Sequence, residues 1–337
     1  MRTALIGLGR MGMRHLSVLQ SLNLDVIGAA DRFQQAFPNA VAAGIPEARL
    51  TTDALDLIKR ERPECVVVAT TAPSHCELVC AAAENGARLI LCEKPMAVSL
   101  DQCDRMIDAC KASGSKLAIN HQMRFMEQYT LPRQIVTGEA FGGLGSVSVV
   151  AGNFGMAMNA LHYFEMFRYM AGSPPVKVNA WFSPESLANP RGAEFEDKAG
   201  SVRLETAAGT RFHLDAGTDQ GHGMMVSYGG RFGRLDVDEL AGHMRLVVRK
   251  AEHRGEPTTR YGMPWETTEQ NITPADAVAP TRAVMEALIA GTDYPDGEAG
   301  RLVVEVLAAA YISHERGGAT VDLREVHLPR DRTFPWA

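Results

Sequence analysis

The sequence predicts an α/β protein of two domains: a doubly wound parallel sheet in residues 1–122 and an α+β domain with an open, mainly antiparallel sheet in residues 123–337. The length of 337 residues is about twice that of a typical domain. Up to residue 122, short apolar runs alternate with amphipathic helical segments, which is typical of a parallel sheet covered by helices. Beyond it, strand-like segments follow one another with few helices between them, which favours antiparallel pairing.

Five runs in the first domain are almost continuously apolar, as in strands that are covered on both faces. The predicted strands are residues 3–6, 25–29, 65–69, 89–91 and 116–119. Helical spacing of apolar residues predicts helices between them at residues 11–20, 74–85 and 100–113. Gly86 and Gly114 follow the last two helices, in the place where glycine commonly ends a helix.

The second domain is expected to be a sheet with a few helices. Its predicted strands are residues 145–153, 176–182, 201–206, 210–216, 233–238 and 244–250. Its predicted helices are residues 128–137, 161–171, 274–290 and 298–316. Residues 207–209 form a short turn, the pair Gly229 and Gly230 marks a further break, and 184–199 and 251–273 are expected to be long loops.

Composition and charge favour a small-molecule partner. The chain carries 34 Lys and Arg against 40 Asp and Glu, a net charge of −6, and has no long run of either sign. This excludes the basic footprint of a protein that binds nucleic acid or an anionic membrane. The first apolar stretch is too short to span a bilayer, so a cytoplasmic location is expected. The six cysteines include no CxxC pair, so neither a zinc site nor a disulfide framework is expected.

A GxGxxG motif follows the first predicted strand and opens a helix, in the residues Gly7, Gly9, Arg10, Met11 and Gly12. Glycines there permit a tight turn and a close backbone approach to a pyrophosphate, which the helix N-terminus attracts. The motif therefore predicts dinucleotide binding.

Asp31 ends the second predicted strand, 22 residues after Gly9, where a carboxylate can accept hydrogen bonds from an adenosine ribose. A carboxylate there favours NAD because it repels a 2′-phosphate. Arg32 could instead meet that phosphate or could be a solvated surface cation, so NADP stays possible.

The segment from Leu91 to Pro95 leaves the fourth predicted strand at its carboxyl end, the edge of an α/β sheet where ligands bind. Lys94 is well placed there for catalysis, although its position alone is equally consistent with an ordinary lysine on a loop.

With these pieces, the chain resembles the glucose-fructose oxidoreductase, inositol dehydrogenase and MocA (Gfo/Idh/MocA) family over nearly all of its length. The resemblance is carried by GLGRMGMRHL at 7–16, VVVATTAPSH at 66–75, EKP at 93–95 and NALHYFEMFRYMAG at 159–172. It implies a Rossmann domain, a second domain on an open antiparallel sheet, and a nicotinamide cofactor between them. It implies that Lys94 and His162 are the catalytic pair, and that Thr70, His75, Glu93 and Lys94 contact the cofactor.

Asn159 and His162 stand three residues apart and would share a helix face with Met166 and Tyr169. His162 alone is more often structural, but the resemblance reverses that interpretation. Asn159 is either a helix N-cap or a substrate contact. Tyr163 is a further candidate contact.

Two acidic positions bear on the proton relay. Many family members carry an Asp four residues before the catalytic His, where this chain has Met158. Glu165 could substitute for it or could simply pair with Arg168. Arg124 could bind an anionic substrate group by its planar fork, although a structural salt bridge is the stronger alternative.

The expected function is an NAD(P)-dependent oxidoreductase that transfers a hydride between nicotinamide and a secondary alcohol or ketone of a sugar, cyclitol or sugar derivative. The alternatives are an NAD-dependent lyase or glycosidase with transient internal oxidation, and a non-catalytic sensor of NAD and sugar. The open sheet of the second domain needs cover on one face, which predicts a homodimer or homotetramer.

Overall fold

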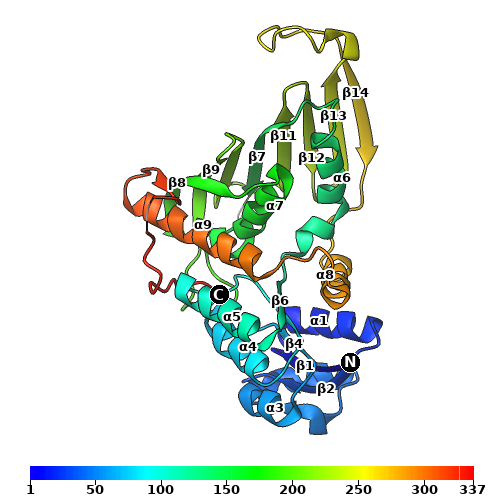
Figure 1. Cartoon of the computed structure of the whole chain (residues 1–337), viewed down its shortest axis with the longest axis vertical. Coiled ribbons are helices and arrows are strands. Elements are labelled where there is room, and N and C mark those ends of the chain that lie inside the picture. Colours follow the sequence, from blue (N-terminus) through cyan, green and yellow to red (C-terminus); the bar gives the residue numbers. More distant parts are fainter. Residues whose placement is uncertain (153, 326) are drawn as a thin grey trace. The chain divides into compact units, whose positions relative to one another are not determined.

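The computed structural model describes residues 1–152, 154–325 and 327–337, which form two compact units (Figure 1). Unit 1 comprises Met1–Gln122, Ala277–Val304 and Pro329–Ala337, and unit 2 comprises Met123–Asp276 and Glu305–Leu328. The first boundary falls where the sequence predicts a change of domain. Two later segments, which the sequence places in the second domain, join unit 1. One reason is local: the backbone N–H of Phe334 donates to the carbonyl of Val98 at 2.9 Å.

Among the described residues, unit 1 contains a six-stranded parallel sheet in the order β3-β2-β1-β4-β5-β6. Its strands are β1 (Arg2–Ile6), β2 (Asp25–Ala30), β3 (Leu50–Thr51), β4 (Cys65–Val68), β5 (Leu89–Cys92) and β6 (Lys116–Ile119). Its helices are α1 (Arg10–Ser21), α2 (Phe37–Ala42), α3 (Ala54–Glu61), α4 (His75–Glu84), α5 (Leu100–Ser113), α8 (Val278–Ala290) and the start of α9 (Gly297–Glu315). All strands and helices predicted in residues 1–122 are confirmed to within one residue at each end.

Local chemistry explains several boundaries in unit 1. All four residues of β4 are buried, as expected for a central strand that is covered on both faces. The Ser99 hydroxyl accepts from the backbone N–H of Gln102 and caps the start of α5, and Gly114, at a φ of +74°, ends that helix. The order of the strands brings the carboxyl ends of β1, β2, β4 and β5 to one edge of the sheet.

Unit 2 has, in its described part, a nine-stranded sheet in the order β14-β13-β12-β11-β7-β10-β9-β8-β15. Only the pair of β7 and β10 is parallel. Its strands are β7 (Leu144–Gly152), β8 (Pro175–Ser186), β9 (Lys198–Thr206), β10 (Arg211–Gly217), β11 (Met225–Gly230), β12 (Gly233–Asp238), β13 (His243–Arg249), β14 (Trp265–Asn271) and β15 (Val321–Asp322). Its helices are α6 (Glu127–Val136), α7 (Leu161–Ala171) and the rest of α9. The expected mainly antiparallel sheet is confirmed.

Two local expectations for unit 2 are wrong, and one strand was not predicted. The predicted loop 251–273 contains β14, whose residues are all exposed, so the edge strand has no apolar alternation by which to recognise it. The predicted loop 184–199 is shorter, because β8 extends to Ser186 and β9 starts at Lys198. The strand β11 was not predicted, but it ends at Gly229 and Gly230, where the sequence predicts a break. A Cβ at Gly230 would lie 2.3 Å from the ring of Phe141. Residue 153, at the end of one predicted strand, lies outside the described residues.

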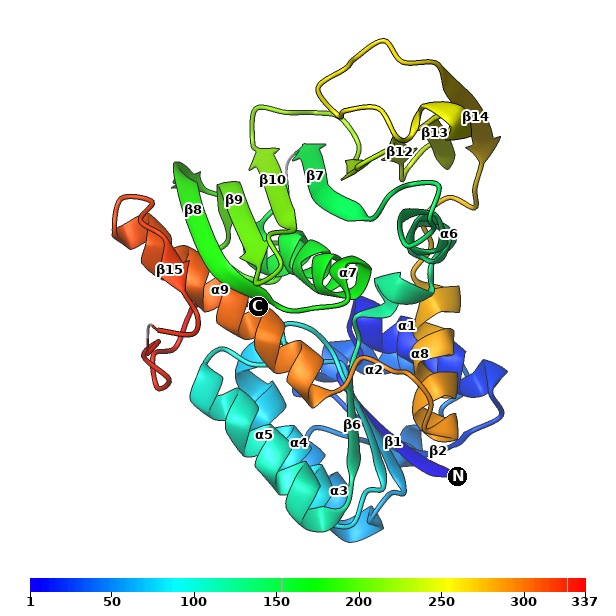
Figure 2. The ribbon, with the colours of Figure 1, turned by 45° about the horizontal axis from the view of Figure 1, so that its top comes forward.

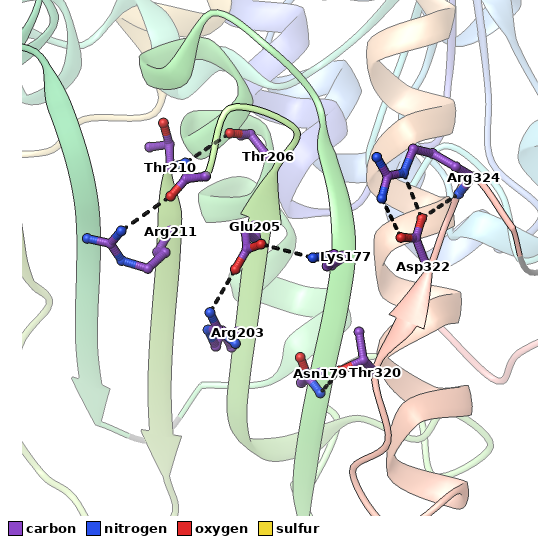
Figure 3. Close-up of polar contacts among 11 residues, drawn as sticks. Lys177, Asn179, Arg203, Glu205, Thr206, Thr210, Arg211, Thr320, Asp322 and Arg324 are labelled. Atoms are coloured by element: carbon purple, nitrogen blue, oxygen red, sulfur yellow. Dashed lines mark hydrogen bonds and ion pairs between the residues drawn. The ribbon is translucent and has the colours of Figure 1, made fainter.

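The two faces of the unit 2 sheet differ in what covers them. Phe164 and Phe167 of α7 pack against Phe212 of β10, with ring centroids 6.1 and 5.3 Å apart, so α7 covers one face (Figure 2). The opposite, open face carries polar side chains: Glu205 accepts from Lys177 at 3.2 Å and from Arg203 at 2.8 Å (Figure 3). Within the described ranges, no helix has the length and apolar character needed to cross a bilayer.

Candidate active site

The glycine turn between β1 and α1 is built for close approach. A Cβ on Gly12 would lie 1.9 Å from the carbonyl oxygen of Gly7, and Gly7 itself has a φ of +95°. A Cβ on Gly9, in contrast, would have no described atom within 4 Å. Gly9 therefore faces open space at the start of α1, where the helix presents backbone N–H groups and partial positive charge. Arg10 and Met11 form the first turn of that helix. This geometry fits the pyrophosphate of a dinucleotide.

Asp31 lies beside this turn, directly after β2. One carboxylate oxygen accepts from the backbone N–H of Leu8 at 2.7 Å, and the other accepts from that of Phe33 at 2.9 Å. A carboxylate offers about four lone-pair sites, so Asp31 can still accept from a ribose hydroxyl. The exposed Arg32 guanidinium lies 4.5 Å from the ring centroid of Phe33. The structure thus brings Asp31 together with the predicted glycine turn.

Glu93 is the centre of a buried polar network at the end of β5. Its Oε1 accepts from His15 Nε2 and from Asn120 Nδ2, both at 2.8 Å, and its Oε2 accepts from the backbone N–H of Lys94 at 3.2 Å. Glu93, His15 and Asn120 are at most 3% exposed. Burial alone would raise the pKa of the Glu93 carboxyl, but its hydrogen bonds and the charges of His15 and Lys94 hold that pKa well below the usual range. Glu93 is therefore an anion that orders the backbone at the half-buried Lys94, whose bond to Pro95 is cis.

His15 and Asn120 are missing from the sequence prediction. A signal for each exists: His15 follows Gly12 by one helical turn on α1, and Asn120 directly follows β6, at the sheet edge where ligands bind. Neither signal indicates that Glu93 is the shared partner, because Asn120 is 27 residues and His15 is 78 residues from Glu93 in the sequence.

Two predicted cofactor contacts lie after β4. The Thr70 hydroxyl accepts from that of Ser74 at 2.7 Å. His75 is fully buried, with Nδ1 at 2.9 Å from the Pro95 carbonyl and Nε2 at 3.2 Å from the Thr70 carbonyl. Burial lowers the pKa of His75. The ring lies between the end of β4 and the segment after Lys94, and one of its nitrogens donates to a carbonyl there.

In unit 2, the predicted substrate residues lie at the start of α7. Residues Met156–Ala160 form a π-helical turn that continues into α7, and the N–H of Ala160 donates to the carbonyl of Gly155 at 3.0 Å. Asn159 lies in this turn and His162 in the first turn of α7, and both are half-buried. His162, Met166 and Tyr169 follow one another on α7 at the spacing of a helix face, whereas Asn159 lies in the π turn, whose residue spacing is wider.

Glu165, Arg124 and Tyr163 lie in the interior of unit 2. Glu165 forms a buried ion pair with Arg124, and Arg168 donates to it from Nε at 2.6 Å. These pairs are the structural alternatives that the sequence left open for Arg124 and Glu165. Tyr163 is 3% exposed and its hydroxyl donates to Glu239 at 2.8 Å. All three side chains thus have partners within unit 2, and a contact of Arg124 or Tyr163 with substrate stays a prediction.

The described residues offer no group of three or more His, Cys, Asp or Glu side chains that could hold a metal ion. All six cysteines are free, and burial raises the pKa of Cys92, next to the Glu93 network, far above the usual range.

The parallel sheet, the glycine turn and the acid after β2 define unit 1 as a dinucleotide-binding domain. Residues 1–121 match the oxidoreductase family with an NAD-binding Rossmann fold. Over these residues the chain is similar to the Gfo/Idh/MocA family, whose Rossmann fold binds NAD.

Several curated relatives of this chain are named as dehydrogenases. Inositol 2-dehydrogenase of Rhodococcus erythropolis is 27% identical over 221 residues, which cover 59% of this chain and 63% of that protein. Inositol 2-dehydrogenase of Burkholderia multivorans is 31% identical over 237 residues, which cover 64% of this chain and 66% of that protein. The chain thus spans somewhat less than two thirds of these relatives.

A solved oxidoreductase from Agrobacterium radiobacter, in complex with NAD+, L-tartaric acid and magnesium, has the same fold. It aligns with a TM-score of 0.80 at 18% identity, covering 96% of this chain and 98% of that one.

Proposed function

We propose that the protein is a cytoplasmic NAD-dependent dehydrogenase that acts on a secondary alcohol of a sugar, cyclitol or sugar derivative. The observation that carries the proposal is the Glu93 network, which orders the backbone of Lys94 at the carboxyl edge of the NAD-binding sheet. The relatives named inositol 2-dehydrogenase support a polyol substrate. Their identity near 30% leaves the particular alcohol to experiment.

Bound NAD supplies the hydride acceptor for such an oxidation. In this proposal, His162 takes the proton of the substrate hydroxyl as the carbon is oxidised, and the Lys94 ammonium donates to the same oxygen and offsets its developing negative charge. A histidine suits the task because its reference pKa near 6.5 lets it gain and lose a proton around neutral pH. Asn159, in the turn before His162, contributes a substrate hydrogen bond.

The test begins with a screen of cyclitols, sugar acids, amino sugars and sugar nucleotides for NADH absorbance. On the substrate found, His162→Ala should lower turnover by about 10²–10⁴-fold with nearly unchanged NAD affinity. Lys94→Ala should lower turnover more than His162→Ala does, and it should also weaken NAD binding, because the ammonium would contact the cofactor as well as the substrate oxygen. His213→Ala, which removes an exposed histidine of β10, is the matched control and should keep full activity.

Near wild-type turnover in His162→Ala would remove this histidine from catalysis. Conversion of a substrate without net NADH, by protein that co-purifies with NAD, would contradict the net dehydrogenase and leave the internally recycling lyase or glycosidase.

A further inference from the structure

The buried carboxylate of Asp197 binds the start of the helix that carries Asn159 and His162. Its Oδ1 accepts from the backbone N–H of Ala157 and its Oδ2 from that of Met158, both at 2.9 Å. Asp197 is 1% exposed and lies directly before β9, about 40 residues further along the chain. All of these groups belong to unit 2.

This contact supplies what the helix lacks locally. The first N–H groups of a helix have no partner within it, and a capping side chain usually provides one. Here the N-cap residue is Gly155, which has no side chain. The negative charge of Asp197 also lies at the positive end of the helix dipole, where a carboxylate is stabilising.

Gly155 leaves the room that Asp197 occupies. A Cβ on Gly155 would lie 1.9 Å from Asp197 Oδ2, closer than any two such atoms can approach. Its φ of −90° is open to any residue, so the conformation of the backbone does not require glycine there. The close approach of the carboxylate does.

Asp197 also holds its own loop. Its carbonyl oxygen accepts from the N–H of Leu187 at 3.0 Å, and its Oδ1 accepts from the N–H of Lys198 at 3.0 Å. One residue thus joins the two ends of the loop 187–197 to the π-helical turn Met156–Ala160. π turns are frequent at functional sites, and the geometry of this one sets the direction of Asn159.

We propose that Asp197 is a positioning residue: it fixes the π-helical turn to the loop 187–197 and so orients Asn159 and His162. The catalytic half of this inference rests on the proposed function. The anchoring half does not, and it can be tested without a substrate.

The anchoring is tested by amide hydrogen exchange on the full-length protein. Asp197→Ala should speed exchange at the amides of Ala157 and Met158 by about 10- to 100-fold, because each loses a hydrogen bond to a charged group. Asp197→Asn keeps one acceptor oxygen, so its exchange rates at these amides should lie between those of the wild type and of Asp197→Ala. Glu196→Ala removes a neighbouring exposed carboxylate and should change neither amide. Unchanged protection in Asp197→Ala, or an equal loss throughout unit 2, would overturn the proposal.

Gly155→Ala gives a second route that leaves the charge in place. The added Cβ must displace the carboxylate, so the same two amides should lose protection. Because the Asp197→Ala change removes the obstructing oxygen, the double variant should be no worse than Asp197→Ala alone. Additive losses in the double variant would contradict the contact.

The catalytic half predicts a split between kinetic constants on a confirmed substrate. Asp197→Ala should lower kcat by about 10-fold or more while NAD affinity stays unchanged, and Asp197→Asn should restore part of it. Wild-type kcat in Asp197→Ala with fast exchange at both amides would overturn the positioning role alone. Substrate conversion without net NADH would instead refute the proposed function and leave the exchange results standing.

Discussion

The Asp31 carboxylate combines two tasks, since it holds the glycine turn through the N–H of Leu8 and is predicted to bind the adenosine ribose. Loss of this carboxylate should lower the affinity for both NAD and NADP, because it disturbs the glycine turn. It should lower the affinity for NAD further, because only NAD has the free 2′-hydroxyl that Asp31 would bind. For Asp31→Ala we expect the affinity for NAD to fall by about 10- to 100-fold more than that for NADP, as for a lost hydrogen bond to a charged group. Titration of both cofactors measures the ratio.

Asp25→Ala is the control, because Asp25 is an exposed carboxylate at the other end of the same strand. Equal losses for NAD and NADP in Asp31→Ala would show that Asp31 does not select the ribose. A wild-type preference for NADP would assign the selection to Arg32.

Sequence reasoning succeeded for residues whose chemistry is local and failed for those with distant partners. Gly7, Gly12 and Asp31 could be predicted because a strand-to-helix turn with glycines has one established geometry. The partners of Glu93 could not be predicted, because the local sequence around His15 or Glu93 does not indicate a hydrogen bond between residues 78 positions apart. Asp197 was missed for the same reason.

At the scale of elements, the turn from β1 to α1 separates two kinds of glycine. A Cβ at Gly12 would meet the carbonyl of Gly7 at 1.9 Å, whereas one at Gly9 would meet no described atom. Gly12→Ala should therefore lower the stability of unit 1 by about 1–3 kcal/mol or more, as overpacking does. Gly9→Ala should keep wild-type stability and lose NAD affinity on the order of 10-fold, because its methyl group occupies the pyrophosphate side.

Thermal unfolding without cofactor and NAD titration, done on both variants, distinguish these outcomes. Equal destabilisation of the two variants would contradict the separation of roles, as would normal NAD binding by Gly9→Ala.

Three elements of unit 2 meet at Glu239, which follows β12 and is 2% exposed. Its carboxyl accepts from the hydroxyls of Tyr129 on α6 and Tyr163 on α7. Burial raises the pKa of Glu239 to about 7, although both hydrogen bonds oppose the rise. Because the folded state holds this proton more tightly than the unfolded state, the free energy of unfolding should fall as pH rises from about 4.5 to 7.

The Glu239→Gln variant removes this titration and keeps a hydrogen-bonding side chain. Relative to the variant, wild-type protein should lose about 3 kcal/mol of stability between pH 4.5 and 7, the equivalent of the raised pKa. Other titrating groups are shared, so they cancel in the comparison. Urea unfolding of both proteins at several pH values gives the difference, and a difference that is constant with pH would refute the link.

Most elements with a buried apolar pattern were predictable, although β11, in which Val226 and Tyr228 are buried, was missed. The central strand β4 is buried at every residue and its run of valines marks it clearly. β14 is exposed at every residue and exists because β13 offers it a hydrogen-bonded edge. The short α2 and β3 were missed as well, since six and two residues carry too little periodicity.

At the scale of the molecule, the chain enters unit 2 twice, at Met123 and at Glu305, and returns to unit 1 twice. The first entry coincides with a change from alternating to successive strands, which the sequence displays. The returns happen within a helix-rich tail whose partners are distant: α8 packs on α1, and Arg330 donates to Asp104 of α5 at 2.5 Å. Local patterns mark where an element forms but not which domain it joins.

The open face of the unit 2 sheet leads to a prediction of self-association. Across this face, the strand register puts Val150 directly beside Met225 and continues past the polar Asp215 and Ser201 to Trp181 in the same row. Trp181, Val150 and Met225 are 65%, 41% and 38% exposed. Apolar side chains gathered on a sheet face of an otherwise polar surface are typical of an interface, and symmetric dimers are the commonest assembly. We therefore expect a homodimer or homotetramer that buries this row.

Light scattering at micromolar concentration should give a mass of at least twice the 36.5 kDa of one chain. Val150→Glu places a charge in the middle of the row, where burial without a partner costs several kcal/mol, and should shift the protein toward a monomer. Leu55→Glu, a similar change at a side chain of α3 that is 38% exposed, should leave the mass unchanged. A wild-type monomer would refute self-association, and an unchanged oligomer in Val150→Glu would move the contact to another surface.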